Sequence, residues 1–339
     1  MDKLMRWLGL AKAAEDETPA KVVKYGFFGN FYRCAQFCGS ALLPNGKVIV
    51  VPSSHPSILI FDPDTRTHEE FGQFDSPAKW NGCGVLPDGR VVFVPSRHPS
   101  ILIVDPNAKT WEEVGSFREF PKWNGCAVLH DGRVIFAPDC HSAILLFDPS
   151  SKTWEEVGDF QGYFKWSGCA LLPNGRVVFS PFDHASILIF DPNTKAYEFV
   201  GKFTESAKFS GCVALEDGKV VFAPANHHSI LVLDCNDRTW EEMEVSPGKM
   251  HPNYGLLQAR TSNRKWSSCG LMPDGRVVFS PHNHPSVLVF DAAAKTLEEF
   301  GCFIGLFKWA GCTALADGNL VFEPCDHTSI LIVDASSAL

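Results

Sequence analysis

The sequence predicts an all-β fold, a seven-bladed β-propeller built from four-stranded antiparallel sheets. Three observations predict it: a phrase that recurs about every 43 residues, four short strand-like segments in each copy, and an N-terminal segment matching the strand that the last copy lacks. Repetition at this period is typical of solenoids, propellers and arrays, in which one unit cannot bury its own faces. The repeat therefore outweighs local propensity in predicting the fold.

One phrase recurs seven times along the chain. Three copies read WNGCAVLHDGRVIFAPDCHSAILLFDP, WSGCALLPNGRVVFSPFDHASILIFDP and WAGCTALADGNLVFEPCDHTSILIVDA. The copies start near residues 37, 80, 123, 166, 209, 266 and 309. One histidine recurs in steps of 43, apart from a single step of 57 that predicts an insertion of 14 residues, located within residues 246–262. These histidines are His55, His98, His141, His184, His227, His284 and His327.

Each copy contains four candidate strands separated by turns. In the fourth copy they are GCALL, RVVFSP, ASILIFDP and AYEFVGKF. Asn-Gly or Asp-Gly between the first two suits a tight hairpin, because glycine readily takes positive φ there. The second and third segments are almost entirely apolar, which predicts strands covered on both faces. The fourth mixes charged and apolar residues, so we expect it to form the half-exposed outer edge.

The two ends of the chain complement each other. The last copy stops at ILIVDASSAL without a fourth strand, while residues 24–31 (KYGFFGNF) align without gaps on residues 110–117 (TWEEVGSF). We expect an N-terminal strand at about 22–31 to complete the last blade, which would remove the free sheet edges of an open ring. The propeller is expected to occupy residues 21–339. Residues 1–20 would form a tail or a short amphipathic helix.

Two features of the repeat resemble known propeller families. An Asp ends the third strand and an aromatic follows six residues later, as in Asp105 to Trp111 and Asp148 to Trp154, which resembles kelch repeats. The phrases PDGRVVF and ILIFDPNT are similar to NHL-type and streptogramin-lyase-like propellers. The resemblance covers residues 22–335 and implies an architecture rather than an activity. The double glycine of kelch repeats is absent.

Composition and charge bound the function. The chain has 339 residues and 45% hydrophobic content, enough for a sizeable core. Its net charge of −9 argues against nucleic acid as a main partner, since proteins that bind phosphate backbones are usually basic. No apolar stretch is long enough to cross a bilayer. The N-terminus lacks the features of a signal peptide, so we expect an intracellular, cytoplasmic location.

The recurrent residues have a structural interpretation. We expect the turns that hold the seven histidines to emerge on one face of the disc, the upper face below. Zinc needs nitrogen ligands that converge at about 2.1 Å, whereas equivalent turns of neighbouring blades are on the order of 12 Å apart. We therefore predict no shared metal and no cofactor, and expect each histidine to hydrogen-bond an adjacent loop or blade. The recurrent cysteines and tryptophans are expected to pack between blades.

Departures from the repeat are the candidates for function. The insertion lengthens the linker between the fifth and sixth copies on the upper face, and extra imidazoles fall in the same sector. A tolerated surface insertion is the alternative. The candidate binding residues are His228, His251, Tyr254, Arg260, Arg264 and His282.

The N-terminal segment is a second departure. Apolar residues at helical spacing within residues 1–13 suggest a short helix that docks on a partner or contacts a membrane surface peripherally. A frayed tail is the alternative.

Two classes of function remain. The leading hypothesis is a non-enzymatic scaffold, or a subunit of a larger assembly, that binds protein partners through the upper face and the N-terminal segment. The rival is a propeller-type small-molecule hydrolase or lyase that uses His228, His251 or His282 with a metal. No catalytic residue is predicted, because no nucleophile set or phosphate loop departs from the repeat.

Overall fold

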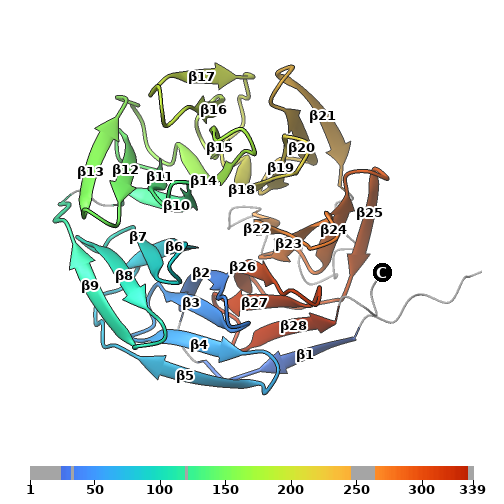
Figure 1. Cartoon of the computed structure of the whole chain (residues 1–339). Helices are drawn as coiled ribbons and strands as arrows, with labels where there is room; N and C mark the ends of the chain where they lie inside the picture. The colour runs from blue at the N-terminus through green and yellow to red at the C-terminus, as the bar shows by residue number, and fades with distance from the viewer. Residues whose placement is uncertain (1–23, 32–33, 119–120, 246–263, 335–339) are drawn as a thin grey trace, which may run out of the picture.

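Seven four-stranded antiparallel sheets surround one axis in the computed structural model (Figure 1). The structure describes residues 24–31, 34–118, 121–245 and 264–334. In six sheets the strands lie in chain order from the axis outwards, and in the seventh the order is β26–β27–β28–β1. This confirms the predicted seven-bladed propeller.

The inner strands begin at the residues where the copies begin. They are β2 (Phe37–Leu42), β6 (Trp80–Val85), β10 (Trp123–Val128), β14 (Trp166–Leu171), β18 (Phe209–Ala214), β22 (Trp266–Leu271) and β26 (Trp309–Ala314). The second strands are β3 (Val48–Pro52), β7 (Val91–Pro95), β11 (Val134–Pro138), β15 (Val177–Pro181), β19 (Lys219–Pro224), β23 (Val277–Pro281) and β27 (Leu320–Pro324).

The third and fourth strands complete each blade. The third strands are β4 (Ile58–Asp62), β8 (Ile101–Asp105), β12 (Ile144–Asp148), β16 (Ile187–Phe190), β20 (Ser229–Asp234), β24 (Val287–Asp291) and β28 (Ile330–Asp334). The outer strands are β5 (Thr67–Phe71), β9 (Thr110–Val114), β13 (Thr153–Val157), β17 (Tyr197–Val200), β21 (Thr239–Glu244), β25 (Thr296–Phe300) and β1 (Lys24–Phe28). Blade 1 is β2–β5, and blades 2 to 7 follow in chain order.

The turns explain two recurrent residue types. In blade 3, Gly132 has φ +87° and its N–H donates to the carbonyl of Leu129 at 3.0 Å, which closes the hairpin between β10 and β11. At the end of β12, one carboxylate oxygen of Asp148 accepts the backbone N–H of Ser150 at 2.8 Å. The Asp that ends each third strand therefore organises the turn that leads to the outer strand.

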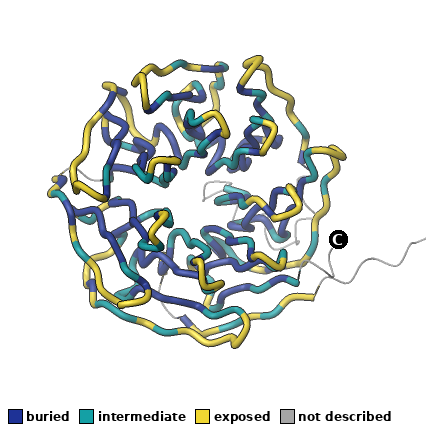
Figure 2. The backbone as a smooth tube through the Cα atoms, in the orientation of Figure 1, coloured by how far each residue is buried: buried dark blue, intermediate teal, exposed yellow. Residues whose placement is uncertain are grey.

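The core lies between neighbouring blades. One cluster joins Val92 and Ile101 of blade 2 to Trp123 and Phe136 of blade 3. The indole N–H of Trp123 donates to the carbonyl of Ala143 at 3.0 Å, which satisfies its only polar atom inside the core. Figure 2 shows the second and third strands mostly buried, the inner strands largely of intermediate burial, and the outer strands largely exposed. Each sheet is thus covered on both faces by the adjacent blades.

The N-terminal strand closes the ring. β1 pairs with β28 in an antiparallel register that runs from Lys24 opposite Asp334 to Phe28 opposite Ile330. The Phe27 ring stacks parallel to that of Trp309, with centroids 6.4 Å apart. This confirms the predicted closure, although the strand ends at Phe28 rather than near residue 31.

The predictions for residues 1–20 and 1–13 lie outside the described residues. Among the residues that the structure describes, no helix is long and apolar enough to span a membrane.

Candidate binding site in the central channel

The inner strands enclose a cavity of about 350 Å³ on the axis. Its wall carries a ring of polar side chains from the second residue of the inner strands, partly joined by hydrogen bonds. Cys38 Sγ donates to Asn81 Oδ1 at 2.7 Å, and Asn124 Nδ2 donates to Ser167 Oγ at 3.3 Å. The ring comprises Cys38, Asn81, Asn124, Ser167, Ser210, Ser267 and Ala310.

Glycines next to this ring keep the channel narrow. Gly125 has φ +79°, and a Cβ placed on it would lie 2.8 Å from the Cα of Gly168 in the next blade. Backbones can approach this closely only where no side chain intervenes. Glycine at this place in the repeat therefore lets the blades meet at the axis.

The residue after the proline that ends each second strand is called the mouth residue below, because in blades 6 and 7 it lines the channel cavity. This position belongs to the upper face and varies strongly between copies, whereas the flanking proline and histidine recur. His282 and Cys325 both line the cavity from it. In chain order the position holds Ser53, Ser96, Asp139, Phe182, Ala225, His282 and Cys325.

Arg264 also lines the cavity. Its guanidinium lies over the Phe182 ring, 4.7 Å from the centroid, so it reaches from the linker before blade 6 to the mouth residue of blade 4. Asp139 interacts with this charge. Burial raises the pKa of the Asp139 carboxyl to about 6, against the opposing effect of Lys165 and Arg264.

His282 offers an unused polar atom to the cavity. The side chain is 5% exposed, and its Nδ1 is buried without a hydrogen-bond partner among the described residues. Burial, together with the positive charges of Arg264 and Lys308, lowers the pKa of His282 to about 3. The imidazole is therefore neutral near pH 7 and can donate a hydrogen bond to a ligand or accept one from it.

Glu323 is a buried carboxyl in the channel wall. Its side chain is fully buried, and burial raises its pKa to about 7. Ser40 Oγ donates to one carboxylate oxygen at 2.8 Å, and the N–H of Gly39 donates to the other at 3.1 Å. The Ser40 hydroxyl lies 2.7 Å from that of Thr313, so the three side chains form one network.

Sequence reasoning missed Glu323. The signal was nevertheless present in the repeat, because every other copy has a small or apolar residue at this position of the second strand. Those residues are Val51, Val94, Ala137, Ser180, Ala223 and Ser280.

The structure separates the predicted binding residues. Arg264 and His282 both line the channel cavity. His228 instead groups with His227 and Glu205 in blade 5 and its preceding linker. His251, Tyr254 and Arg260 lie outside the described residues, as does the 246–262 insertion.

Six recurrent histidines bond within their own turns rather than to a neighbouring loop. In each, Nδ1 accepts the backbone N–H two residues ahead, as from Ser57 to His55 at 3.2 Å. Each ring also packs on the aromatic residue that begins its blade, at 4.4 Å between centroids for His98 and Trp80. These six are His55, His98, His141, His184, His284 and His327.

The recurrent cysteines face neighbouring blades. Cys169 Sγ lies 3.9 Å from the carbonyl of Ile135 in the preceding blade and packs in the cluster between blades 3 and 4. Burial raises its pKa well above the usual value, as it does for its counterparts Cys83, Cys126, Cys212, Cys269 and Cys312. Thiols that stay protonated and packed are poor metal ligands and nucleophiles.

A recurrent lysine ties each blade to the turns before it. Lys308 Nζ donates to the carbonyls of His282 and Gly305, each at 3.0 Å. Burial lowers the pKa of this ammonium to about 7. The lysine thereby fixes the backbone of the mouth residue His282. Blade 1 has Gln36 in its place.

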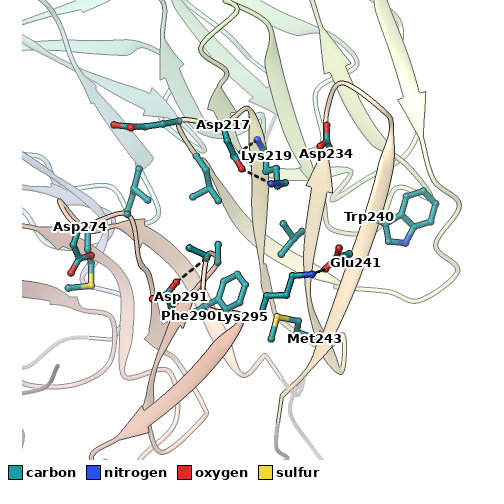
Figure 3. Close-up of a pocket in the computed structure, with 18 of the residues that line it drawn as sticks. Asp217, Lys219, Asp234, Trp240, Glu241, Met243, Asp274, Phe290, Asp291 and Lys295 are labelled. Atoms are coloured by element: carbon teal, nitrogen blue, oxygen red, sulfur yellow. Dashed lines mark hydrogen bonds and ion pairs between the residues drawn. The ribbon is translucent and has the colours of Figure 1, made fainter.

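A second cavity of about 770 Å³ lies between blades 5 and 6 on the lower face (Figure 3). Its floor includes Val232, Met243, Leu271 and Phe290, and acidic residues surround it. Lys295 crosses from blade 6 to Glu241 of blade 5 at 2.5 Å. The acidic residues are Glu216, Asp217, Asp234, Glu241, Asp274 and Asp291.

Smaller side chains accompany this second cavity. Leu297 of blade 6 occupies the outer-strand position of Trp111, and Val245 occupies the linker position of Phe117. Between blades 1 and 2 the Trp111 ring packs on Phe74, with centroids 5.4 Å apart. The interface between blades 5 and 6 therefore lacks this pair of aromatic rings.

Comparisons with known proteins support the architecture. No family model and no curated protein matches the sequence. Among solved structures, a streptogramin B lyase superposes with a TM-score of 0.76 at 15% identity, covering 92% of this chain and 97% of that one. Virginiamycin B lyase from Staphylococcus aureus, a catalytically inactive His→Ala variant with quinupristin, gives 0.76 at 14%, covering 92% and 99%.

A third structure, Kuenenia stuttgartiensis hydrazine synthase, gives a TM-score of 0.67 at 13% identity, covering 94% of this chain and 98% of that one. At these identities the likeness shows the propeller fold alone.

Proposed function

We propose that the protein is a ligand-binding propeller whose channel mouth holds a small polar molecule with an anionic group. The observation that carries this proposal is the unpartnered Nδ1 of His282, buried in the wall of a cavity that Arg264 also lines. A buried polar atom without a partner costs free energy unless a ligand or water satisfies it.

The chemistry of the mouth defines the ligand. A planar guanidinium binds carboxylate or phosphate through paired hydrogen bonds. The neutral imidazole of His282 can donate or accept one more hydrogen bond. The circle of inner-strand side chains that includes Asn81 and Asn124 presents amide and hydroxyl groups to the same cavity. The volume of about 350 Å³ is at the small end of ligand sites. A compact molecule with one anionic group and neighbouring hydroxyl or amide groups fits this lining.

Equilibrium dialysis against a cell extract, read by mass spectrometry, tests the proposal. We expect the full chain to concentrate at least one small anion, and Arg264→Met and His282→Phe each to reduce that retention at least tenfold. Arg133→Met is the matched control, because Arg133 pairs with Asp131 in an exposed hairpin. Equal retention by all four proteins, with thermal unfolding unchanged, would remove the proposal.

Turnover of the bound molecule is a second candidate, supported by Glu323. A carboxyl with pKa near 7 can accept or donate a proton at neutral pH, as a hydrolase or lyase requires. If the ligand is turned over, Glu323→Gln will keep binding but lose most of the turnover. Equal turnover by the variant would exclude Glu323 as the acid or base. Among the described residues, no metal-ligating cluster combines His228 with His282.

A scaffold role is supported by the cavity between blades 5 and 6. An apolar floor with a mostly acidic rim suits a partner segment that carries basic and apolar side chains. Leu271 is 37% exposed at this cavity, so Leu271→Arg adds charge at the groove without opening the core. We expect partners in pull-downs from a lysate to be lost with this variant. An identical partner set would exclude the groove as the docking surface.

A further inference from the structure

His227 departs from the geometry of the other six recurrent histidines. Its Nδ1 does not accept the N–H two residues ahead but lies 2.8 Å from a carboxylate oxygen of Glu205. The hydroxyl of Ser229, in the same turn, is buried without a partner among the described residues. Blade 5 therefore lacks the hydrogen bond that the other six histidines accept within their own turns. Its histidine ring faces the Glu205 carboxylate instead.

Four metal-ligating side chains meet at this place. His227 Nε2 lies 3.4 Å from Glu242 Oε2, and His228 Nε2 lies 3.8 Å from the same oxygen. Glu205, His227 and His228 each offer one possible ligand atom, and these three atoms lie within 4.8 Å of one another. The group comes from the linker before β18, the turn between β19 and β20, and the outer strand β21.

Three of these groups have the character of a site, because their combination occurs in one blade. An acidic residue at the position of Glu205 recurs only as Glu119 before blade 3, and no other copy has a histidine at the position of His228. The position of Glu205 holds Ser76 between blades 1 and 2, and the position of His228 holds Pro56 or Pro99 in other copies. Neither residue fills core space, since both are exposed, whereas His227 between them is only 6% exposed and its ring packs on Phe209. A rigid central ligand flanked by two adjustable ones can close on an ion.

We propose that Glu205, His227 and His228 bind a zinc-class divalent transition metal. Imidazole and carboxylate are ligands that zinc accepts, at about 2.0–2.2 Å from the ion. In a tetrahedral arrangement the ligand atoms are roughly 3.3 Å apart. Binding therefore separates His227 Nδ1 from Glu205 by a few tenths of an ångström and draws His228 inwards.

Glu242 completes the arrangement from outside the ligand set. With a metal bound at Nδ1, the Nε2–H of His227 would donate to the Glu242 carboxylate, which lies 3.4 Å away. Such a carboxylate–histidine pair orients the ring and raises its basicity as a ligand. Three protein ligands leave a fourth position for water or a substrate atom. The site is distinct from the channel, whose lining includes neither Glu205 nor His227.

Calorimetric titration of the full chain with zinc chloride, after removal of any affinity tag, tests the site. We expect one equivalent to bind and cobalt(II) to give the visible spectrum of a tetrahedral complex. His228→Pro and Glu205→Ser should each weaken binding at least tenfold. Both variants install residues that other copies already carry at these positions, so they should fold.

Two controls separate this site from other histidines. His282→Phe alters the channel, and Ala185→His creates an adjacent histidine pair in blade 4, where Gly162 stands at the position of Glu205. We expect both to bind one equivalent with unchanged affinity. No zinc binding by the unaltered chain, unchanged affinity in His228→Pro and Glu205→Ser, or a second equal site in Ala185→His would overturn the assignment.

Discussion

The interface between blades 3 and 4 and the interface between blades 7 and 1 are built on the same plan with different side chains. In the first, Trp166 and Cys169 pack on the preceding blade, and Lys165 Nζ donates to the carbonyls of Asp139 and Gly162 at 3.1 and 2.9 Å. In the second, the corresponding residues are Phe37, Ser40 and Gln36.

The polar groups of the two interfaces also differ. The side-chain amide of Gln36 is buried with no partner among the described residues, whereas the equivalent lysines bond backbone carbonyls. Glu323 replaces the small or apolar residue of the other copies and bonds Ser40 across the interface. The interface between blades 7 and 1 therefore carries buried polar groups that the others lack.

The difference between the two interfaces separates a part of the ring that mainly stabilises the fold from a part that can carry a function. Between blades 3 and 4, apolar packing and the hydrogen bonds of Lys165 join consecutive parts of the chain. Blades 7 and 1 are already tied by the pairing of β1 with β28, so this interface can hold a network that faces the channel. Buried polar groups that stabilise little are commonly found at functional sites.

Removing β1, which closes the ring beside the interface between blades 7 and 1, should have the largest effect on the stability of the protein. A chain lacking residues 1–31 leaves the edge of β28 unpaired, and an apolar edge strand recruits other chains. We expect loss of the monomer on size-exclusion chromatography and an unfolding temperature lower by more than 10 °C. Removal of residues 1–20 alone should change neither. A stable monomer without residues 1–31 would show that β1 is dispensable.

Alanine at the axial glycines should distinguish the two interfaces. Gly125→Ala places its Cβ 2.8 Å from the backbone of Gly168 at positive φ, so we expect a loss of about 3 kcal/mol of unfolding free energy. Gly311→Ala meets a Glu323 oxygen, which is a side-chain atom that can move, so the loss should be smaller.

Two controls refine the glycine comparison, each measured by denaturant unfolding. Gly46→Ala has positive φ but no atom within 4 Å, so only the conformational cost of about 1 kcal/mol should remain. Glu323→Val, the residue of other copies, should relieve the effect of Gly311→Ala. If Gly125→Ala and Gly46→Ala lower the free energy of unfolding equally, the close approach of the backbones at the axis makes no contribution to stability.

The pH dependence of stability should single out Glu323. Its folded pKa of about 7 exceeds the usual 4.5, so between these values the folded chain binds more protons than the unfolded one. Stability from this group is therefore full below pH 4.5, falls as pH rises from 4.5 to 7, and is lower by about 3 kcal/mol above pH 7. The difference between the chain and Glu323→Gln, followed by chemical unfolding from pH 5 to 8, should show this slope. Parallel curves would contradict it.

The smallest effect is expected at Gln36. Gln36→Leu removes an amide that makes no hydrogen bond to the described residues, so the free energy of unfolding should change by less than about 1 kcal/mol or rise. Lys165→Leu is the matched variant between blades 3 and 4. It should cost about 2 kcal/mol, because two buried carbonyls lose their donor. Similar losses in both variants would show that Gln36 is paired in solution.

The repeat predicted the architecture because a propeller blade is a local unit. Strand order, hairpins and the ring closure all follow from copies laid side by side. Arg264 and His282 were found because they break the pattern next to the insertion. Glu323 was missed, since its environment depends on burial and on residues of the adjacent blade that are distant in sequence.

The metal-ligating cluster could not be found from spacing for a related reason. His227 follows the repeat in sequence, and only its ring orientation departs from it. Glu205 lies 22 positions before His227 in a linker of variable sequence. Its proximity to the imidazoles depends on how that linker passes over the turn between β19 and β20.

The pairing of Lys24 with Asp334 also sets a constraint on protein synthesis. A ribosome makes β1 first and its partner β28 about 300 residues later, a delay on the order of tens of seconds. During that interval the complete blades can form in turn, while the apolar, aromatic face of β1 has no strand to join. The nascent chain therefore stays open until translation has passed the last blade, and a chaperone that shields its first strand would favour the monomer.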